Sequence, residues 1–118
     1  MPAKLLLKHE GLTLSSYEFD KKQLHIGRQT GNDIQLDDPA VSGRHARLVL
    51  KPNDYLENYY DVYLEDLGST NGTIVNDGKI IRQQLKHGDV IRIGGHEFTF
   101  DSGEDEHYEQ TAIYLPDN

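Results

Sequence analysis

Hydrophobic and polar positions alternate along most of this chain, and the alternating runs are short. Leu24 and Ile26 share one face of such a run, and Leu48 and Leu50 share one face of another. A period of two predicts strands that each bury one face, whereas helical spacing is nearly absent. The runs predicted to be strands cover 3–10, 13–19, 23–28, 33–36, 46–51, 59–66, 73–75, 79–82, 90–93 and 96–101.

About ten short strands with frequent turns between them favour an all-β sandwich or barrel. Asn76-Asp77-Gly78 and Gly94-Gly95 have the composition of tight turns between antiparallel strands. In such a fold, loops at one end of the sandwich would carry a binding surface. We expect one domain over residues 1–101, followed by an acidic, flexible tail over 102–118.

Composition narrows the possible partners. The net charge is −8, and residues 101–118 contain six acidic and no basic side chains, so the first hundred residues carry only −2. The chain therefore lacks the basic balance of a nucleic-acid-binding protein, and no apolar run is long enough to span a membrane. It has no cysteine and its six histidines are scattered, so neither a metal nor a cofactor is expected. A cytoplasmic location is consistent with the absence of cysteine.

Three predicted loops carry residues that suit an anion. Gly27 precedes Arg28 at a strand end, where glycine permits close backbone approach and the arginine fork can bind a dianion. The loop at 41–46 sets a serine hydroxyl among backbone N–H groups. The run from Asp66 to Thr73, DLGSTNGT, offers a hydroxyl and an amide, although its Asn-Gly pair also signals a hairpin. Taken singly, each loop is better explained as a surface side chain, a coincidental spacing or an ordinary turn than as a binding site.

A hydrolytic enzyme is the main alternative class. Ser42, His45 and Asp66 have the side chains of a catalytic triad. However, the chain has no Gly-x-Ser-x-Gly elbow and no Walker-type loop. A Ser-x-x-His pair within one short loop also rarely aims the imidazole at its own serine. We therefore do not expect an enzyme.

Taken together, the segments resemble the forkhead-associated (FHA) domain over about residues 26–100. The matching segments, in order, are Gly27-Arg28; Asn32-Asp33-Ile34-Gln35-Leu36; Val41-Ser42-Gly43-Arg44-His45-Ala46; 66–73 with Val75-Asn76; and 85–94. The departure is Gly43, where that family often has a larger polar or basic residue. The resemblance implies a β-sandwich of about eleven strands in two twisted, mostly antiparallel sheets. It also implies that loops at one end bind phosphothreonine in partner proteins.

The resemblance also implies roles for individual residues. Arg28 and Ser42 would contact the phosphate, with the Gly43 N–H and the Arg44 charge close by. Thr70 would shape the pocket for the phosphate and the γ-methyl group, and Asn71 would bond the peptide backbone. The residues implied to hold the loops in shape are Gly27, His45, Gly72 and Asn76.

The expected function is a signalling or scaffold module that reads phosphothreonine in substrates of a Ser/Thr kinase. A phosphate-independent interaction module of the same fold remains the alternative. In the tail, Thr111 is followed three residues later by Tyr114, and once phosphorylated it could be a ligand for the domain or for a second copy. A short strand or a linker is the other interpretation of that segment.

Overall fold

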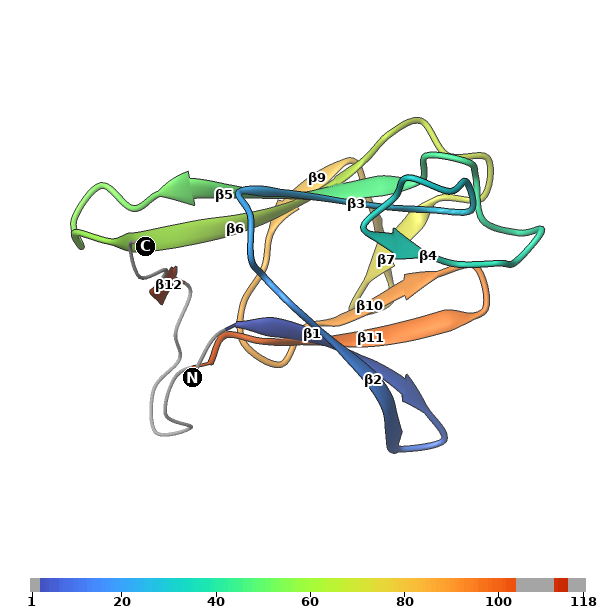
Figure 1. Ribbon diagram of the computed structural model, residues 1–118, viewed down its shortest axis with the longest axis horizontal. Coiled ribbons are helices and arrows are strands. Elements are labelled where there is room, and N and C mark those ends of the chain that lie inside the picture. Colours follow the sequence, from blue (N-terminus) through green and yellow to red (C-terminus); the bar gives the residue numbers. More distant parts are fainter. Residues whose placement is uncertain (1–2, 104–111, 115–118) are drawn as a thin grey trace.

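The computed structural model describes residues 3–103 and, as backbone, 112–114. These residues form twelve strands and no helix, in two sheets that face one another (Figure 1). Sheet A has the order β2 (Leu12–Glu18), β1 (Lys4–His9), β11 (His96–Asp101), β10 (Val90–Ile93), β7 (Thr73–Val75) and β8 (Gly78–Ile80). Sheet B has the order β12 (Ala112–Tyr114), β6 (Tyr59–Asp66), β5 (Ala46–Pro52), β3 (Gln23–Gly27) and β4 (Ile34–Gln35), and β9 (Arg82–Gln84) also pairs with β6.

The strands pair as the alternation predicts. Every pair of strands is antiparallel except β3 with β4, which run parallel. The all-β sandwich and its mostly antiparallel sheets are therefore confirmed. One face of each sheet supplies the core, because alternate side chains of a strand point to opposite faces. The fully buried side chains of greatest volume include Phe98, Phe100, Leu5, Ile26 and Leu48.

The segment 79–82, predicted as one strand, is instead two short strands in different sheets. Ile80 pairs with Thr73 in sheet A, whereas Arg82 pairs with Glu65 in sheet B. Ile81 lies at the crossing, is 85% exposed, and its carbonyl accepts a hydrogen bond from the N–H of Asp66 at 2.8 Å. Ile80 and Ile81 are adjacent apolar residues, so the segment has the composition of one short strand, and the sequence pattern alone did not reveal the change of sheet.

The Asn-Gly pair at 71–72 does not form a hairpin turn. The run that contains it connects β6 in sheet B to β7 in sheet A, so it bridges the two layers. The two-residue turns are instead Glu10-Gly11, Asn76-Asp77 and Gly94-Gly95, since His9 pairs with Leu12, Val75 with Gly78 and Ile93 with His96.

Several loops gather at the end of the sandwich where β3, β6 and β10 finish. In Figure 1 this is the right-hand end, and it includes the connections that follow β3, β4, β6 and β10. The strand β12 lies toward the other end, where Ala112 pairs with Asp61 near the start of β6. No helix long and apolar enough to cross a bilayer occurs in the part of the chain that the structure describes.

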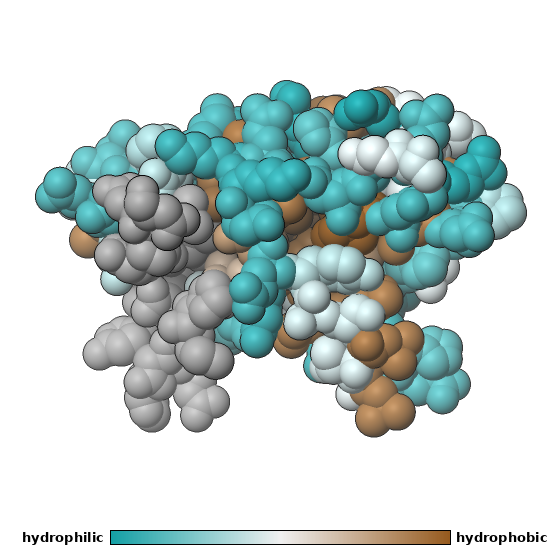
Figure 2. Space-filling view, viewed as in Figure 1, coloured by the Kyte–Doolittle hydropathy of each residue, from teal (hydrophilic) through white to brown (hydrophobic). Residues whose placement is uncertain are grey.

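The surface facing the viewer in Figure 2 is mostly hydrophilic. A brown patch at its lower right lies over β2, the edge strand of sheet A, whose Leu12 and Leu14 are exposed. The loop end carries no comparable apolar area on this face.

Candidate functional site

Three loops at the right-hand end of the molecule in Figure 1 line an open pocket of about 400 Å³. They follow β3, β4 and β6, three strands of sheet B that finish at this end of the sandwich (Figure 1). The lining residues are Arg28, Pro39, Ala40, Val41, Ser42, Gly43, Thr70 and Asn71. Arg28 is the only charged residue among them, so the lining is positive and contains no carboxylate.

Backbone hydrogen bonds hold the first loop against the second. The N–H of Arg28 donates to the carbonyl of Ser42 at 3.0 Å, and the N–H of Gln29 donates to the carbonyl of Gly43 at 3.2 Å. This contact requires a glycine at position 27, because a Cβ there would stand 2.2 Å from the Gly43 carbonyl oxygen. The backbone at Gly27 can therefore approach Gly43 closely, because glycine has no side chain. This approach places Arg28, the next residue, at the pocket.

The hydroxyl of Ser42 links the second loop to the third. Its Oγ accepts a hydrogen bond from the N–H of Thr70 at 3.1 Å. A hydroxyl has one donor hydrogen besides its lone pairs, so the Ser42 proton remains available to an anion in the pocket.

The amide of Asn71 is held in a defined orientation. Its Nδ2 donates to the carbonyl of Ala40 at 2.9 Å. The carbonyl oxygen of the same side chain is then left as an acceptor at the pocket's edge, where a backbone N–H of a bound peptide could donate to it.

His45 is a structural residue beneath the pocket. It is 0% exposed, and its Nδ1 accepts from the N–H of Ser42 at 3.1 Å. Its Nε2 lies 2.9 Å from the carbonyl oxygen of Gly72, to which it donates. The two contacts fix the neutral tautomer with the proton on Nε2, and they join the second loop to the third.

Asp66 organises the third loop, a role that the sequence interpretation did not give it. Its carboxylate accepts from the N–H groups of Gly68 and Ser69, both at 3.0 Å, and from the Thr73 hydroxyl at 2.8 Å. The Ser69 hydroxyl also donates to it and in turn accepts from the N–H of Gly72. Partial burial raises the pKa of Asp66, but these hydrogen bonds outweigh it and hold the pKa below its usual range.

Asn32 is a second supporting residue, to which the sequence interpretation assigned no role of its own. Its Nδ2 donates to the carbonyls of Gln29 at 2.7 Å and Gly43 at 2.8 Å, and so ties the first loop to the second. The signal that could have found it is an asparagine five residues after Gly27, within the same predicted loop.

The catalytic triad is not assembled. Both ring nitrogens of His45 bond backbone groups, and neither is bonded to the Ser42 hydroxyl. The Asp66 carboxylate bonds the third loop rather than the imidazole. Ser42, His45 and Asp66 therefore do not form the hydrogen-bonded chain of a catalytic triad.

The remaining predicted site residues lie in different places. Arg44 is exposed but does not line the pocket. Asn76 orders a different loop, because it lies at the far end of β7 from Thr73. There its side chain bonds the Asp89 carboxylate at 2.8 Å and the Val90 N–H at 2.9 Å. Gly72, with φ +87°, turns the third loop beside the pocket. Thr111 lies outside the described residues.

No group of three potential ligands among His, Cys, Asp and Glu gathers anywhere in residues 3–103. The pocket lining suits a phosphate-sized anion, because its donors are an arginine fork, a serine hydroxyl and backbone N–H groups.

Comparison with known proteins gives several relatives. The family model for the FHA domain matches residues 24–94. The glycogen accumulation regulator GarA of Mycobacterium tuberculosis is 34% identical over 101 residues, which are 86% of this chain and 58% of GarA. The oxoglutarate dehydrogenase inhibitor of Corynebacterium jeikeium is 34% identical over 104 residues, 88% of this chain and 67% of that protein. This chain thus spans little more than half the length of GarA.

Solved structures agree with the sequence relatives. A domain solved in a study of phosphothreonine-dependent FHA domain interactions has 31% identity and a TM-score of 0.68, covering 86% of this chain and 96% of that one. EmbR of Mycobacterium tuberculosis, solved with a low-affinity phosphopeptide, has 35% identity and a TM-score of 0.72, covering 85% of this chain and 24% of EmbR. The family match, the sequence relatives and the fold agree, and this chain belongs to the FHA domain family.

Proposed function

We propose that this chain is a phosphothreonine-binding module that recruits phosphorylated partner proteins through the pocket at the end of the sandwich. The observation that carries the proposal is the convergence of the Arg28 guanidinium, the Ser42 hydroxyl and the Asn71 amide at one carboxylate-free pocket. A phosphothreonine carries a charge of about −1.5 to −2 at neutral pH and three strong acceptor oxygens. The donors and the ligand therefore match in charge and in number.

Each residue has a part in this proposal. Arg28 and Ser42 bind phosphate oxygens, together with the N–H of Gly43. Thr70 lies beside the Ser42 hydroxyl and shapes the pocket for the γ-methyl group, which distinguishes threonine from serine. Asn71 accepts a hydrogen bond from the peptide backbone. Arg44, exposed near the rim, adds positive potential without direct contact.

The module acts by binding rather than by catalysis. GarA and the corynebacterial relative are named as a regulator and an inhibitor, which agrees with a protein that works through its partners. Proteins phosphorylated on threonine by a Ser/Thr kinase in the cytoplasm are the partners that this function needs.

The tail gives a route to self-association. Ala112 pairs with Asp61, whereas the pocket lies beyond Asp66. The five steps between them along β6 span about 17 Å, at about 3.4 Å per residue. A phosphorylated Thr111 would therefore fit the pocket of a second copy while β12 stays paired. A molar mass that rises on phosphorylation, and does not rise in Thr111→Ala, would support this route.

The test of the main proposal is calorimetric titration with three matched peptides that differ only in carrying threonine, phosphothreonine or phosphoserine. We expect binding to phosphothreonine alone, and a loss of about tenfold or more in Arg28→Ala, because bonds to charged groups contribute about 1.5–3 kcal/mol. Arg44→Ala is the matched control, and we expect less than about threefold loss from an exposed charge. Equal affinity for threonine and phosphothreonine would instead establish the phosphate-independent module.

A further inference from the structure

The outer face of sheet A carries a row of cationic side chains that begins beside the pocket. We propose that this row binds an acidic segment of the same phosphorylated partner, which would cross the face of the sheet after its phosphothreonine enters the pocket. This inference rests on the proposed function and adds a second requirement, namely that the partner has an acidic segment near its phosphothreonine. We call Lys79, Arg92 and Lys8 the basic row.

The strand register places the basic row on one line across five strands. Lys79 on β8 pairs with Ile74 on β7, and Ile74 pairs with Arg92 on β10. Arg92 pairs with Glu97 on β11, and Glu97 pairs with Lys8 on β1. Adjacent strands lie about 4.8 Å apart, so the line is about 19 Å long. An extended segment of about six residues spans that length.

All members of the line face away from the core. Ile91, Ile93 and Phe98 on the same strands are 0% exposed, so their sequence neighbours point to the opposite face of the sheet. Thr73 and Val75, the neighbours of Ile74, are likewise buried. The basic row thus lies on the outer face of the sheet, where Lys79 and Arg92 are exposed and Lys8 is half-buried.

Lys79 connects the row to the pocket. Its side chain lies over Gly72, and its Cε is 2.6 Å from the position that a Cβ on that glycine would occupy. Gly72 directly follows Asn71, which lines the pocket. Among the described residues Lys79 has no ion pair, so its charge is available to a ligand that leaves the pocket across Gly72.

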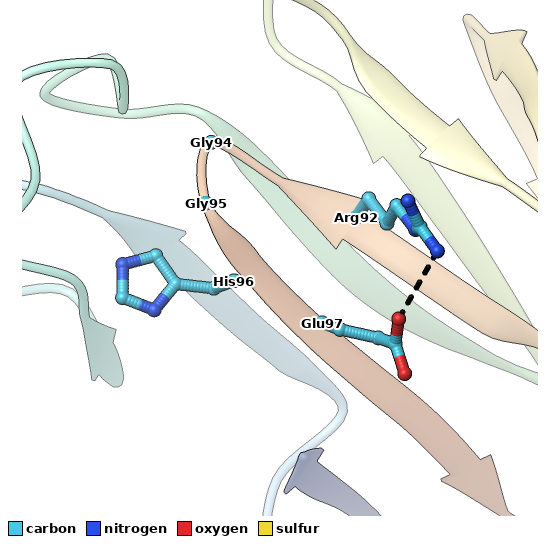
Figure 3. A pocket seen from close by; sticks show the side chains of 5 residues that line it. All are labelled: Arg92, Gly94, Gly95, His96 and Glu97. Carbon is cyan, nitrogen blue, oxygen red and sulfur yellow. Dashed lines mark ion pairs between the residues drawn. The ribbon is translucent and has the colours of Figure 1, made fainter. Parts of the chain in front are cut away.

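Arg92 is only partly neutralised. Its Nη2 lies 3.2 Å from the Glu97 carboxylate, and the two side chains are 55% and 41% exposed. Figure 3 shows this pair on one side of the β10–β11 hairpin, with His96 directed to the other side. A guanidinium has five N–H donors, so Arg92 keeps donors for a second anion. Lys8, beyond Glu97, has no ion pair within residues 3–103.

Sheet B has a smaller cationic cluster on its outer face. There Glu65 bonds Arg47 at 2.6 Å and Arg82 at 2.9 Å, so two cations share one carboxylate. The excess of cations in the basic row matters because the protein carries −8 overall. A row with three cations and one anion beside the pocket is a local excess of positive charge, and it favours an acidic segment there.

The test uses the whole chain and a set of phosphothreonine peptides. Each peptide carries either three glutamates or three glutamines, placed either before or after the phosphothreonine and beginning about three residues from it. We expect glutamates on one side to strengthen binding about fivefold, with the gain falling at high salt. Lys79→Gln should remove about threefold of that gain and leave the glutamine peptide unaffected.

Lys4→Gln is the matched control for Lys8→Gln. Both lysines lie on β1 and face outward, but Lys4 pairs with Asp101 four residues away from the row. We expect the glutamate preference to fall in Lys8→Gln and to persist in Lys4→Gln, whose change in net charge is the same. Equal losses in the two variants would mean a diffuse charge effect and would overturn the basic row.

The two proposals fail separately. Binding that needs phosphothreonine and Arg28 but gives equal affinity for glutamate and glutamine peptides would overturn the basic row and leave the proposed function intact. Absence of any phosphothreonine preference would overturn both. A glutamate preference that Lys79→Gln does not reduce would also overturn the inference, because Lys79 is the residue that joins the row to the pocket.

Discussion

The Oγ of Ser42 accepts a hydrogen bond from the N–H of Thr70 at 3.1 Å, although 28 positions separate the two residues in the chain. This contact joins loops from two separate connections, and the hydroxyl keeps its own proton for a second hydrogen bond. The same serine therefore both builds the site and offers a donor to the ligand.

Replacement of this serine should separate affinity from folding. In Ser42→Ala we expect a loss of about tenfold or more in phosphopeptide affinity, because a donor to a charged group and the support of Thr70 disappear together. The exposed N–H of Thr70 can bond water instead, so the melting temperature should change little. Calorimetric titration and thermal unfolding measure the two quantities. A large fall in stability with unchanged affinity would show that the hydroxyl serves only the fold.

The close approach at Gly27 gives a steric prediction. Gly27→Ala places a Cβ 2.2 Å from the Gly43 carbonyl oxygen, so the first two loops must separate. We expect weaker peptide binding and a lower free energy of unfolding. Gly78→Ala is the control, since a Cβ there would meet only the Val75 carbonyl, at an ordinary 3.6 Å. Equal effects of the two substitutions would remove the steric argument.

His45 should matter for stability more than any exposed histidine. His45→Leu leaves the Ser42 N–H and the Gly72 carbonyl without their partner, and an unsatisfied buried group costs about 1–3 kcal/mol. We expect a fall of about 2 kcal/mol or more in the free energy of unfolding, measured with urea. His9, whose side chain is 71% exposed, is the comparison, and His9→Leu should be nearly neutral. No loss of stability in His45→Leu would contradict the assigned role.

Acid should loosen the third loop through Asp66. Its pKa is lowered in the folded chain, so its contribution to stability is fully present above the unfolded value of about 3.9. That contribution is lost as the pH falls from there through the folded pKa. We expect the stability of the parent chain to decline more steeply below about pH 4 than that of Asp66→Asn. Urea titrations at several pH values give both slopes, and parallel slopes would exclude this role for Asp66.

Much of the fold was predictable because its signals are local. Residue types with high strand propensity at 59–66 and the turn after 73–75 identified β6 and β7 with their observed ends, and Gly94-Gly95 was identified as the turn between β10 and β11. The segment 79–82 was predicted wrongly as one strand, because Ile80 and Ile81 form one short apolar run although the chain crosses between sheets at Ile81. Strand periodicity reports which side of a strand is buried, not which sheet the strand joins.

The candidate site was predicted less completely. Arg28, Ser42, Thr70 and Asn71 were identified through the family resemblance, and they line one pocket. The parts of Asp66 and Asn32 were missed because their hydrogen bonds depend on loop conformation. Asn76 was grouped with the pocket loops, but the pairing of β7 with β8 sets it at the other end of that strand.

The sequence by itself determined the all-β class, most strand positions and the family, because these depend on short-range periodicity and on residue types at fixed spacings. Only the tertiary structure decided which loops share a pocket, that His45 bonds backbone groups rather than the Ser42 hydroxyl, and that Lys79, Arg92 and Lys8 fall on one line. Those relationships depend on the pairing of strands that are distant in sequence. Their register is fixed by burial of whole faces of the two sheets rather than by any local signal.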